Sequence, residues 1–181
     1  MKSEPAGLAG SFLLRPTRIG DERGFFARIW DDAWSDELGL DARNVQTNLS
    51  YNRHGGTIRG LHYQIAPWLE SKLLRCTRGA VFDVAVDLRV DSPTYGQWQG
   101  HIIDAESRDL VFVPAGCAHG YQALEDHSEV SYQVSHPYVP GAERGLRWDD
   151  PALAIAWPIT DGITVSDKDR AWPDLALEPA R

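Results

Sequence analysis

Four side chains in this sequence could together move a proton next to a carbonyl group: His62, Lys72, Tyr132 and Asp169. A ketone acidifies the neighbouring C–H bond, and a histidine has the near-neutral basicity needed to remove that proton. A carboxylate on the other ring nitrogen would fix the histidine tautomer, while an ammonium group would stabilise the enolate oxygen. A tyrosine hydroxyl could return a proton from the opposite side. The set therefore suits inversion of a stereocentre beside a ketone.

The same residue types also have ordinary structural roles. A lone histidine in a strand is more often a hydrogen-bonded structural group, and a tyrosine on an apolar strand face usually belongs to the core. Lysine and aspartate usually lie at the surface. Strict alternation along residues 57–64 also places Arg59 and His62 on opposite faces, unless a bulge at Gly60 re-aims one of them. Sequence spacing alone does not show that the four side chains converge.

Strands must position these residues, because patterns of period two dominate the chain. Residues 80–88 alternate, with apolar side chains at the even positions and Asp83 and Asp87 on the other face. Further strand patterns occupy residues 57–64, 110–113 and 129–135. Many short strands separated by glycine and proline turns are typical of an all-β sandwich or barrel.

The rest of the chain fits one domain over residues 1–181. One short helix is expected from Asp31 to Leu38, ended by Gly39. The C-terminal third is rich in proline and aspartate, so we expect it to wrap the barrel as loops.

Composition excludes several classes of function. A net charge of -8 and a pI near 5.1 argue against a nucleic-acid partner, which needs a basic surface. No apolar run is long enough to cross a membrane, and the N-terminus has no signal-peptide pattern, so a cytoplasmic protein is expected. Cys76 and Cys117 fit no zinc or redox spacing and are expected to be buried, unpaired residues.

Several segments, taken together and in order, closely resemble the dTDP-4-dehydrorhamnose 3,5-epimerase family of the cupin superfamily. They are Asp21-Glu22-Arg23-Gly24-Phe25-Phe26, Ile58-Arg59-Gly60-Leu61-His62-Tyr63-Gln64, Lys72-Leu73-Leu74-Arg75, the run 82–89, Ala118-His119-Gly120, Trp148-Asp149-Asp150-Pro151 and Ser166-Asp167-Lys168-Asp169. The resemblance implies a double-stranded β-helix, the cupin jelly-roll barrel, with short peripheral helices and usually dimeric. It implies an epimerase that inverts C3, C5 or both in a nucleoside-diphosphate 4-keto-6-deoxyhexose, with dTDP as the favoured nucleotide. The pathway implied is deoxysugar biosynthesis, and neither a cofactor nor a metal is expected.

The resemblance also implies roles for individual residues. It assigns His62 as the general base paired with Asp169, Tyr132 as the acid on the opposite face and Lys72 as the stabiliser of the enolate. The positions that match substrate contacts of the family are Arg23, Gln46, Asn48, Arg59, His119, Tyr138, Glu143 and Lys168. Arginines among them suit a diphosphate, because a planar guanidinium binds phosphate oxygens in pairs.

The sequence departs from the family pattern at four places: Arg28, Thr47, Gln133 and His136-Pro137. The family often has glutamate at the first position and aspartate at the second, so two acidic groups are missing where the ligand is expected. The identity of the nucleotide and of the sugar substituents, as well as the carbon that is inverted, are therefore left open.

Three alternatives remain. A metal-dependent cupin, such as a dioxygenase or isomerase, would use paired histidines, whereas this chain offers only His62 with Glu70 and His119. A nucleotide-sugar 3,4-ketoisomerase would have a different motif around the histidine. A non-catalytic sugar-binding cupin would have no need of all four reactive side chains.

Overall fold

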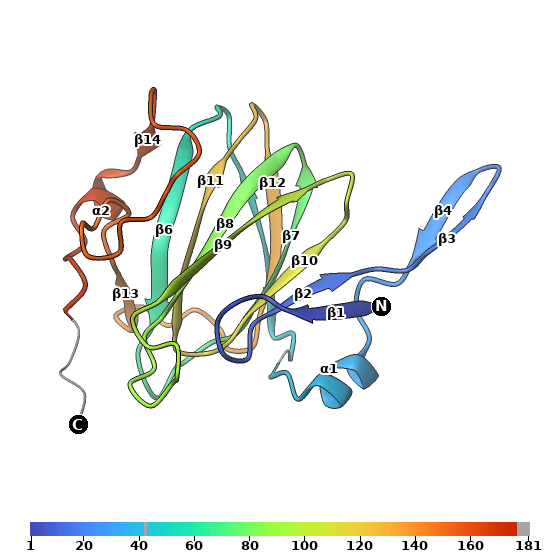
Figure 1. Ribbon diagram of the computed structural model, residues 1–181, viewed down its shortest axis with the longest axis horizontal. Helices are drawn as coiled ribbons and strands as arrows, with labels where there is room; N and C mark the ends of the chain where they lie inside the picture. Colours follow the sequence, from blue (N-terminus) through green and yellow to red (C-terminus); the bar gives the residue numbers. More distant parts are fainter. Residues whose placement is uncertain (42, 177–181) are drawn as a thin grey trace.

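Two β-sheets that face each other carry the functional residues, in a computed structural model that describes residues 1–41 and 43–176 (Figure 1). The first sheet has the strand order β1-β2-β10-β7-β12-β5, and the second has the order β13-β6-β11-β8-β9. Apart from the parallel pair of β14 with β6, neighbouring strands are antiparallel. This arrangement is a jelly-roll barrel, the double-stranded β-helix expected from the sequence. The strands of the barrel are β1 (Lys2–Pro5), β2 (Phe12–Arg15), β5 (Gln46–Tyr51), β6 (Thr57–Gln64), β7 (Lys72–Arg78), β8 (Ala80–Asp87), β9 (Trp98–Asp104), β10 (Leu110–Val113), β11 (Cys117–Ala123), β12 (Glu129–Val134), β13 (Glu143–Gly145) and β14 (Thr164–Val165).

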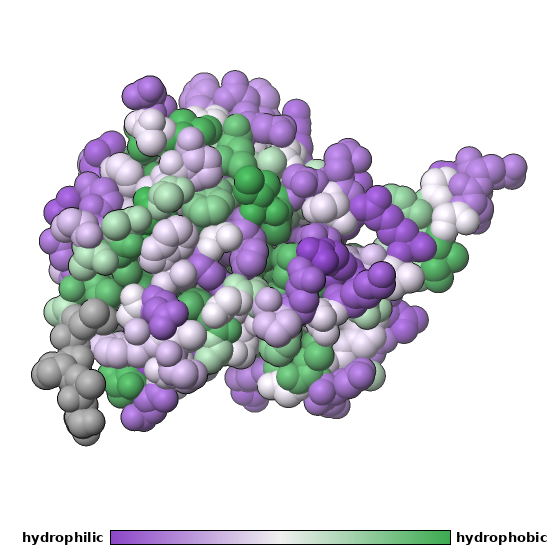
Figure 2. All heavy atoms as spheres, in the orientation of Figure 1, coloured by the Kyte–Doolittle hydropathy of each residue, from purple (hydrophilic) through white to green (hydrophobic). Residues whose placement is uncertain are grey.

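A separate hairpin, β3 (Arg18–Asp21) and β4 (Gly24–Ala27), projects away from the barrel (Figure 1). Its surface carries hydrophobic as well as hydrophilic residues (Figure 2). Ile19 is 68% exposed and Phe26 is 64% exposed. Apolar side chains so far from any core of their own chain are typical of an interaction surface.

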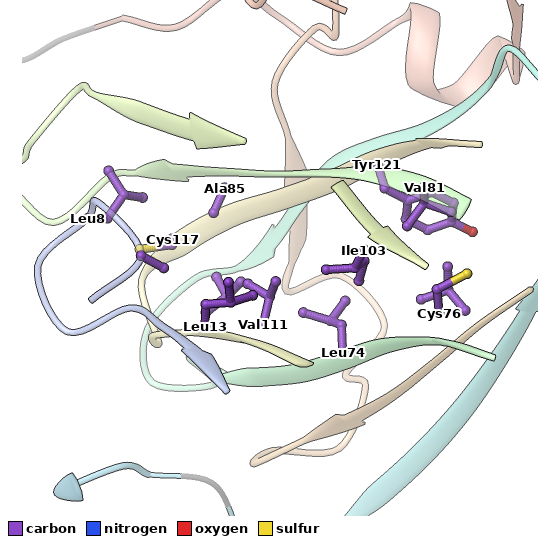
Figure 3. Packing of buried hydrophobic residues seen from close by; sticks show 13 residues of the cluster. Leu8, Leu13, Leu74, Cys76, Val81, Ala85, Ile103, Val111, Cys117 and Tyr121 are labelled. Carbon is purple, nitrogen blue, oxygen red and sulfur yellow. The ribbon is translucent and has the colours of Figure 1, made fainter. Parts of the chain in front are cut away.

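The core between the sheets is made by alternate residues of both sheets (Figure 3). Leu74, Val111 and Val130 come from the first sheet, while Val81 and Ala85 come from the second. A second apolar cluster covers the outer face of the second sheet, where loop residues such as Leu146, Leu153 and Trp157 pack against Ile58, Val84 and Val86. Both faces of β8 are therefore buried, and the expected loop covering by the C-terminal third is confirmed.

The local predictions hold at the expected helix and at the cysteines. Helix α1 (Asp32–Leu38) begins after Asp31, whose side chain accepts a hydrogen bond from the backbone of Ala33. It ends at Gly39, which adopts the left-handed conformation with φ of 65°.

Cys76 and Cys117 are buried and free. Burial raises the pKa of Cys76 to about 11 and that of Cys117 to about 12, so neither is a reactive thiolate at neutral pH.

The bulge at Gly60 is confirmed by the register between β6 and β11. His62 pairs with His119 and Arg59 pairs with Tyr121, so two residues of β6 lie opposite one residue of β11. Gly60 has φ of 122°, and a Cβ there would lie 2.6 Å from the Cα of Gly120. Only glycine fits this close approach, and the extra residue turns Arg59 and His62 to the same side.

Neither helix in the described part of the chain is long and apolar enough to span a membrane. The second, α2 (Asp167–Arg170), was not predicted as a helix; it begins after Ser166, whose hydroxyl accepts from the backbone of Asp169.

Candidate active site

Two adjoining cavities are lined by residues of both sheets. Their volumes are about 520 Å³ and about 290 Å³. Both are lined by His62, Lys72, Tyr132 and Lys168. Strand β6 of the second sheet supplies His62, whereas β7 and β12 of the first sheet supply Lys72 and Tyr132. Candidate residues from distant parts of the chain thus meet in one space.

His62 and Asp169 form a short hydrogen bond, with 2.6 Å between Nε2 and Oδ1. The Asp169 side chain is only 6% exposed and that of His62 is 29% exposed. Because the carboxylate can only accept, Nε2 carries the hydrogen of this bond and Nδ1 of the neutral ring is left as the acceptor. The pair therefore has the tautomer that a general base requires.

The Asp169 carboxylate is held in its ionised form. Burial by itself would raise its pKa, but it is outweighed by the hydrogen bond from His62, by the positive charge of that ring when it is protonated, and by hydrogen bonds from the Gly60 backbone and from Ser166. The net effect is a pKa below the usual range for aspartate. An anion at this position stabilises the imidazolium that forms once His62 has taken up a proton.

Tyr132 and Lys72 face His62 from the other sheet. Burial raises the pKa of Tyr132, and the nearby Tyr121 and Glu70 raise it further, so its hydroxyl keeps its proton at neutral pH. The Lys72 ammonium lies 3.2 Å from Glu70 and donates to the carbonyl of His62 at 3.3 Å. A protonated hydroxyl and an ammonium group thus line the same cavity as His62.

The side chain of Arg59 is held by two hydrogen bonds. Its Nε donates to Asn52 at 2.8 Å and its Nη2 donates to the carbonyl of Tyr51 at 3.0 Å. Deeper in the cavity, His119 is hydrogen-bonded to the buried carboxylate of Asp83, with 2.6 Å between Nε2 and Oδ1. Arg59 and His119, two of the predicted substrate contacts, both line the larger cavity.

The remaining predicted contacts form the rim of the smaller cavity. The lining includes Gln46, Asn48, Tyr138, Glu143 and Lys168. Glu143 accepts from Lys168 at 2.6 Å and from the Tyr138 hydroxyl at 3.2 Å. Gln46 accepts from the Tyr138 backbone at 3.2 Å and donates to Asn48 at 2.8 Å. The hydrogen-bonded rim gives a ligand an aromatic ring and several polar groups.

Comparison with known proteins agrees with this geometry. The model of the dTDP-4-dehydrorhamnose 3,5-epimerase family matches residues 5–176. The chain belongs to this family. A dTDP-4-dehydrorhamnose 3,5-epimerase of Sinorhizobium fredii is 45% identical over 167 residues, covering 92% of this chain and 86% of the relative.

Solved structures of relatives have the same fold. The dTDP-4-dehydrorhamnose 3,5-epimerase of Bacillus anthracis, with TDP and PPi bound, is 41% identical, with a TM-score of 0.90 and coverage of 96% of this chain and 100% of that chain. NovW, a 4-keto-6-deoxy sugar epimerase from the novobiocin biosynthetic gene cluster of Streptomyces spheroides, is 38% identical, with a TM-score of 0.89 and coverage of 96% and 87%. These similarities support an epimerase and not the metal-dependent or ketoisomerase alternatives.

The residues that a metal-dependent cupin would use have other partners in the site. Glu70 is paired with Lys72, and His119 is paired with Asp83. Among the described residues, no group of three or more histidine, cysteine, aspartate or glutamate side chains is placed to hold a metal ion.

Arg23, one of the predicted substrate contacts, does not line the cavities of its own chain. Arg23 lies at the tip of the β3–β4 hairpin, where its side chain is 84% exposed and pairs with Asp21. The other eleven candidate residues line one or both cavities. The spacing of residues along the sequence did not predict that Arg23 lies apart from the cavities. The hairpin precedes the strands that form the site in the chain, and it projects away from the barrel.

Neither Arg28 nor Thr47, the two positions where the family often has an acidic residue, lines a cavity of the single chain. Arg28 lies near the base of the hairpin and pairs with Asp31 at 2.7 Å. Thr47 lies on the exposed face of β5 and donates to Asn44. The alternation of β5 turns Gln46 and Asn48 toward the cavity, and therefore turns Thr47 away from it.

Some site residues were missed by sequence reasoning. Tyr121 and Ser50 line the larger cavity and share a hydrogen bond of 2.7 Å. Asp83 anchors His119 from the next strand. The alternation of residues 80–88 did place Asp83 opposite the apolar face, and that pattern was the available signal for a polar group inside the barrel.

Proposed function

We propose that this protein is an epimerase of a dTDP-linked 4-keto-6-deoxyhexose in deoxysugar biosynthesis, inverting C3, C5 or both. The observation that carries the proposal is the placement of a base and an acid on two facing sheets. His62 with Asp169 approaches the cavity from the second sheet, and Tyr132 approaches it from the first. A sugar ring between them would have one face toward each group, which is the geometry that inversion needs.

The reaction follows from these positions. Nδ1 of His62 takes the proton from the carbon beside the ketone, and the electron pair of the C–H bond moves to the carbonyl oxygen as an enolate. Lys72 stabilises the negative charge on that oxygen. The enolate carbon then takes a proton from the Tyr132 hydroxyl on the opposite face, and exchange with solvent returns His62 and Tyr132 to their starting forms.

The substrate class is supported by the lining and by the relatives. Arg59, His119 and Lys168 provide positive or donor groups suited to a diphosphate. The Bacillus anthracis relative was solved with TDP and PPi, and NovW is described as a 4-keto-6-deoxy sugar epimerase. In this scheme Tyr138 at the rim offers an aromatic face to the nucleobase.

A homodimer belongs to the same proposal. The β3–β4 hairpin presents Ile19, Phe25 and Phe26 to solvent, and the outward face of the edge strand β5 presents Leu49 and Tyr51. Pairing of two copies would cover these apolar groups and could bring Arg23 of one copy to the site of the other. Light scattering coupled to gel filtration should give twice the mass of the chain, and a monomer would contradict the proposal.

We also propose that the protein is cytoplasmic. Two buried cysteines that form no disulfide are usual for proteins of reducing compartments.

The test of the activity is proton NMR of dTDP-4-keto-6-deoxyglucose with the purified protein in heavy water. Deuterium at C3 and C5 would identify a double epimerase, while deuterium at one carbon would identify a mono-epimerase. Absence of exchange with this and other nucleotide-linked 4-keto sugars would overturn the proposal.

A further inference from the structure

Trp172, two residues beyond α2, packs against His62 without lining either cavity. Its indole ring meets the His62 imidazole edge to face, with 6.4 Å between the centroids and 69° between the planes. The Lys168 ammonium lies 5.8 Å from the indole centroid, within the range of a cation–π contact. The ring is thus placed between the proposed base and a residue of the rim.

The strand beneath Trp172 is shaped to receive it. Gly145 of β13 pairs directly with His62 of β6. A Cβ at Gly145 would lie 2.5 Å from two atoms of the Trp172 ring, closer than any real contact. The φ of Gly145 is not positive, so the glycine is required here by space and not by backbone conformation. Because Gly145 has no side chain, the indole of Trp172 can lie in this space beside His62.

The indole N–H does not explain this placement. Nε1 of Trp172 is buried and has no hydrogen-bond partner among the described residues. A buried indole N–H usually finds a partner, and leaving it without one costs free energy. The ring does contact His62, Lys168 and Gly145.

The His62 ring needs a second constraint. Its hydrogen bond to Asp169 restrains Nε2, while Nδ1 has no hydrogen-bond partner among the described residues, so small rotations about χ1 and χ2 still move Nδ1. Rotation would move Nδ1 away from the line of the C–H bond, and misplacement by about 1 Å can cost about a hundredfold in rate. An aromatic edge against the imidazole removes this freedom.

We propose that Trp172, seated on Gly145, is a positioning residue that fixes the plane of the His62 ring for proton removal. The inference rests on the proposed epimerase function. It concerns the rate of the chemical step and not substrate binding, because Trp172 lines neither cavity.

The experiment measures deuterium exchange into the substrate for Trp172→Ala, Trp172→Phe and Gly145→Ala. Trp172→Ala should lower kcat at least about tenfold and change KM less than about threefold, while Trp172→Phe should restore most of kcat. Gly145→Ala should also lower kcat, because its methyl group displaces the indole. In the Trp172→Ala background the methyl group has room, so Gly145→Ala should have no further effect.

Trp98→Ala is the matched control, because Trp98 packs in the apolar layer on the outer face of the same sheet and lines neither cavity. It should lower the melting temperature without lowering kcat. If Trp172→Ala unfolds the protein, the Phe and Gly145 variants still test the inference. Wild-type kcat in Trp172→Ala, or equal effects of Gly145→Ala in both backgrounds, would overturn it. Absence of exchange by the wild type would instead overturn the proposed function.

Discussion

His62 and Tyr132 face the same cavity from two different sheets, one on β6 and the other on β12. The two strands are not neighbours, so the residues do not belong to one hydrogen-bonded ladder. A flat substrate held between the sheets therefore meets a base on one side and a proton donor on the other. This relationship separates removal of the proton from its return, and the two steps can be tested by different substitutions.

Replacement of His62 by alanine should abolish the first step. We expect at least a ~10³-fold loss in the rate of deuterium exchange, which corresponds to loss of a general base. His54→Ala is the control, because His54 is exposed and lines neither cavity. A loss of less than about tenfold in His62→Ala would show that another group removes the proton.

Replacement of Tyr132 by phenylalanine should impair the second step alone. Exchange of the C–H hydrogen should continue, because His62 can still remove and return the proton on its own face. Formation of the inverted product, followed by NMR of the sugar, should fall by about 10²-fold or more. Tyr95→Phe serves as a control, since Tyr95 lies in the loop between β8 and β9 and lines neither cavity. Loss of exchange together with inversion would assign Tyr132 a different role.

Arg23 should act on substrate binding only through the dimer. We expect Arg23→Ala to raise KM about tenfold or more, in line with loss of a charge-assisted hydrogen bond, without changing the molecular mass in solution. Arg43→Ala is a matched control, because Arg43 is also exposed and paired with an aspartate two residues away. An unchanged KM in Arg23→Ala would show that the hairpin tip does not contribute to substrate binding.

Asp87 should make the free energy of unfolding depend on pH. Burial alone would raise its pKa, but hydrogen bonds from Arg89, Ser92 and Thr94 lower the pKa to about 2, against 3.8 for a free side chain. Because the folded pKa is depressed, the stabilisation is present above pH 3.8 and is lost as the pH falls toward 2. We expect Asp87→Asn to lower the free energy of unfolding at pH 7 by about 2 kcal/mol.

Urea unfolding at pH 7 and at low pH checks this prediction. The difference between wild type and Asp87→Asn should shrink as the pH falls through the window from 3.8 to about 2. Asp91→Asn, an exposed carboxylate in the loop that follows, should have little effect at either pH. A difference that stays constant with pH would show that ionisation of Asp87 is not the cause.

The sequence by itself determined the local elements and the chemistry of the side chains. Period-two alternation located β8 and β12 to within about one residue, and a short apolar run located β10, because each strand has at least one face in the core. The cap residues Asp31 and Gly39 gave the limits of α1, since their effects act within one turn. The family motifs then named the residues that line the cavities.

Only the tertiary structure decided how those residues meet. Alternation cannot show that the bulge at Gly60 turns Arg59 toward His62, because the extra residue is visible only against the register of β11. Nor can it show that Arg23 leaves the barrel on a hairpin, or that Trp172 lies on Gly145 beside the base. Such relationships depend on contacts between segments far apart in the chain, and a local sequence pattern contains no information about which distant segment will fill the space beside it.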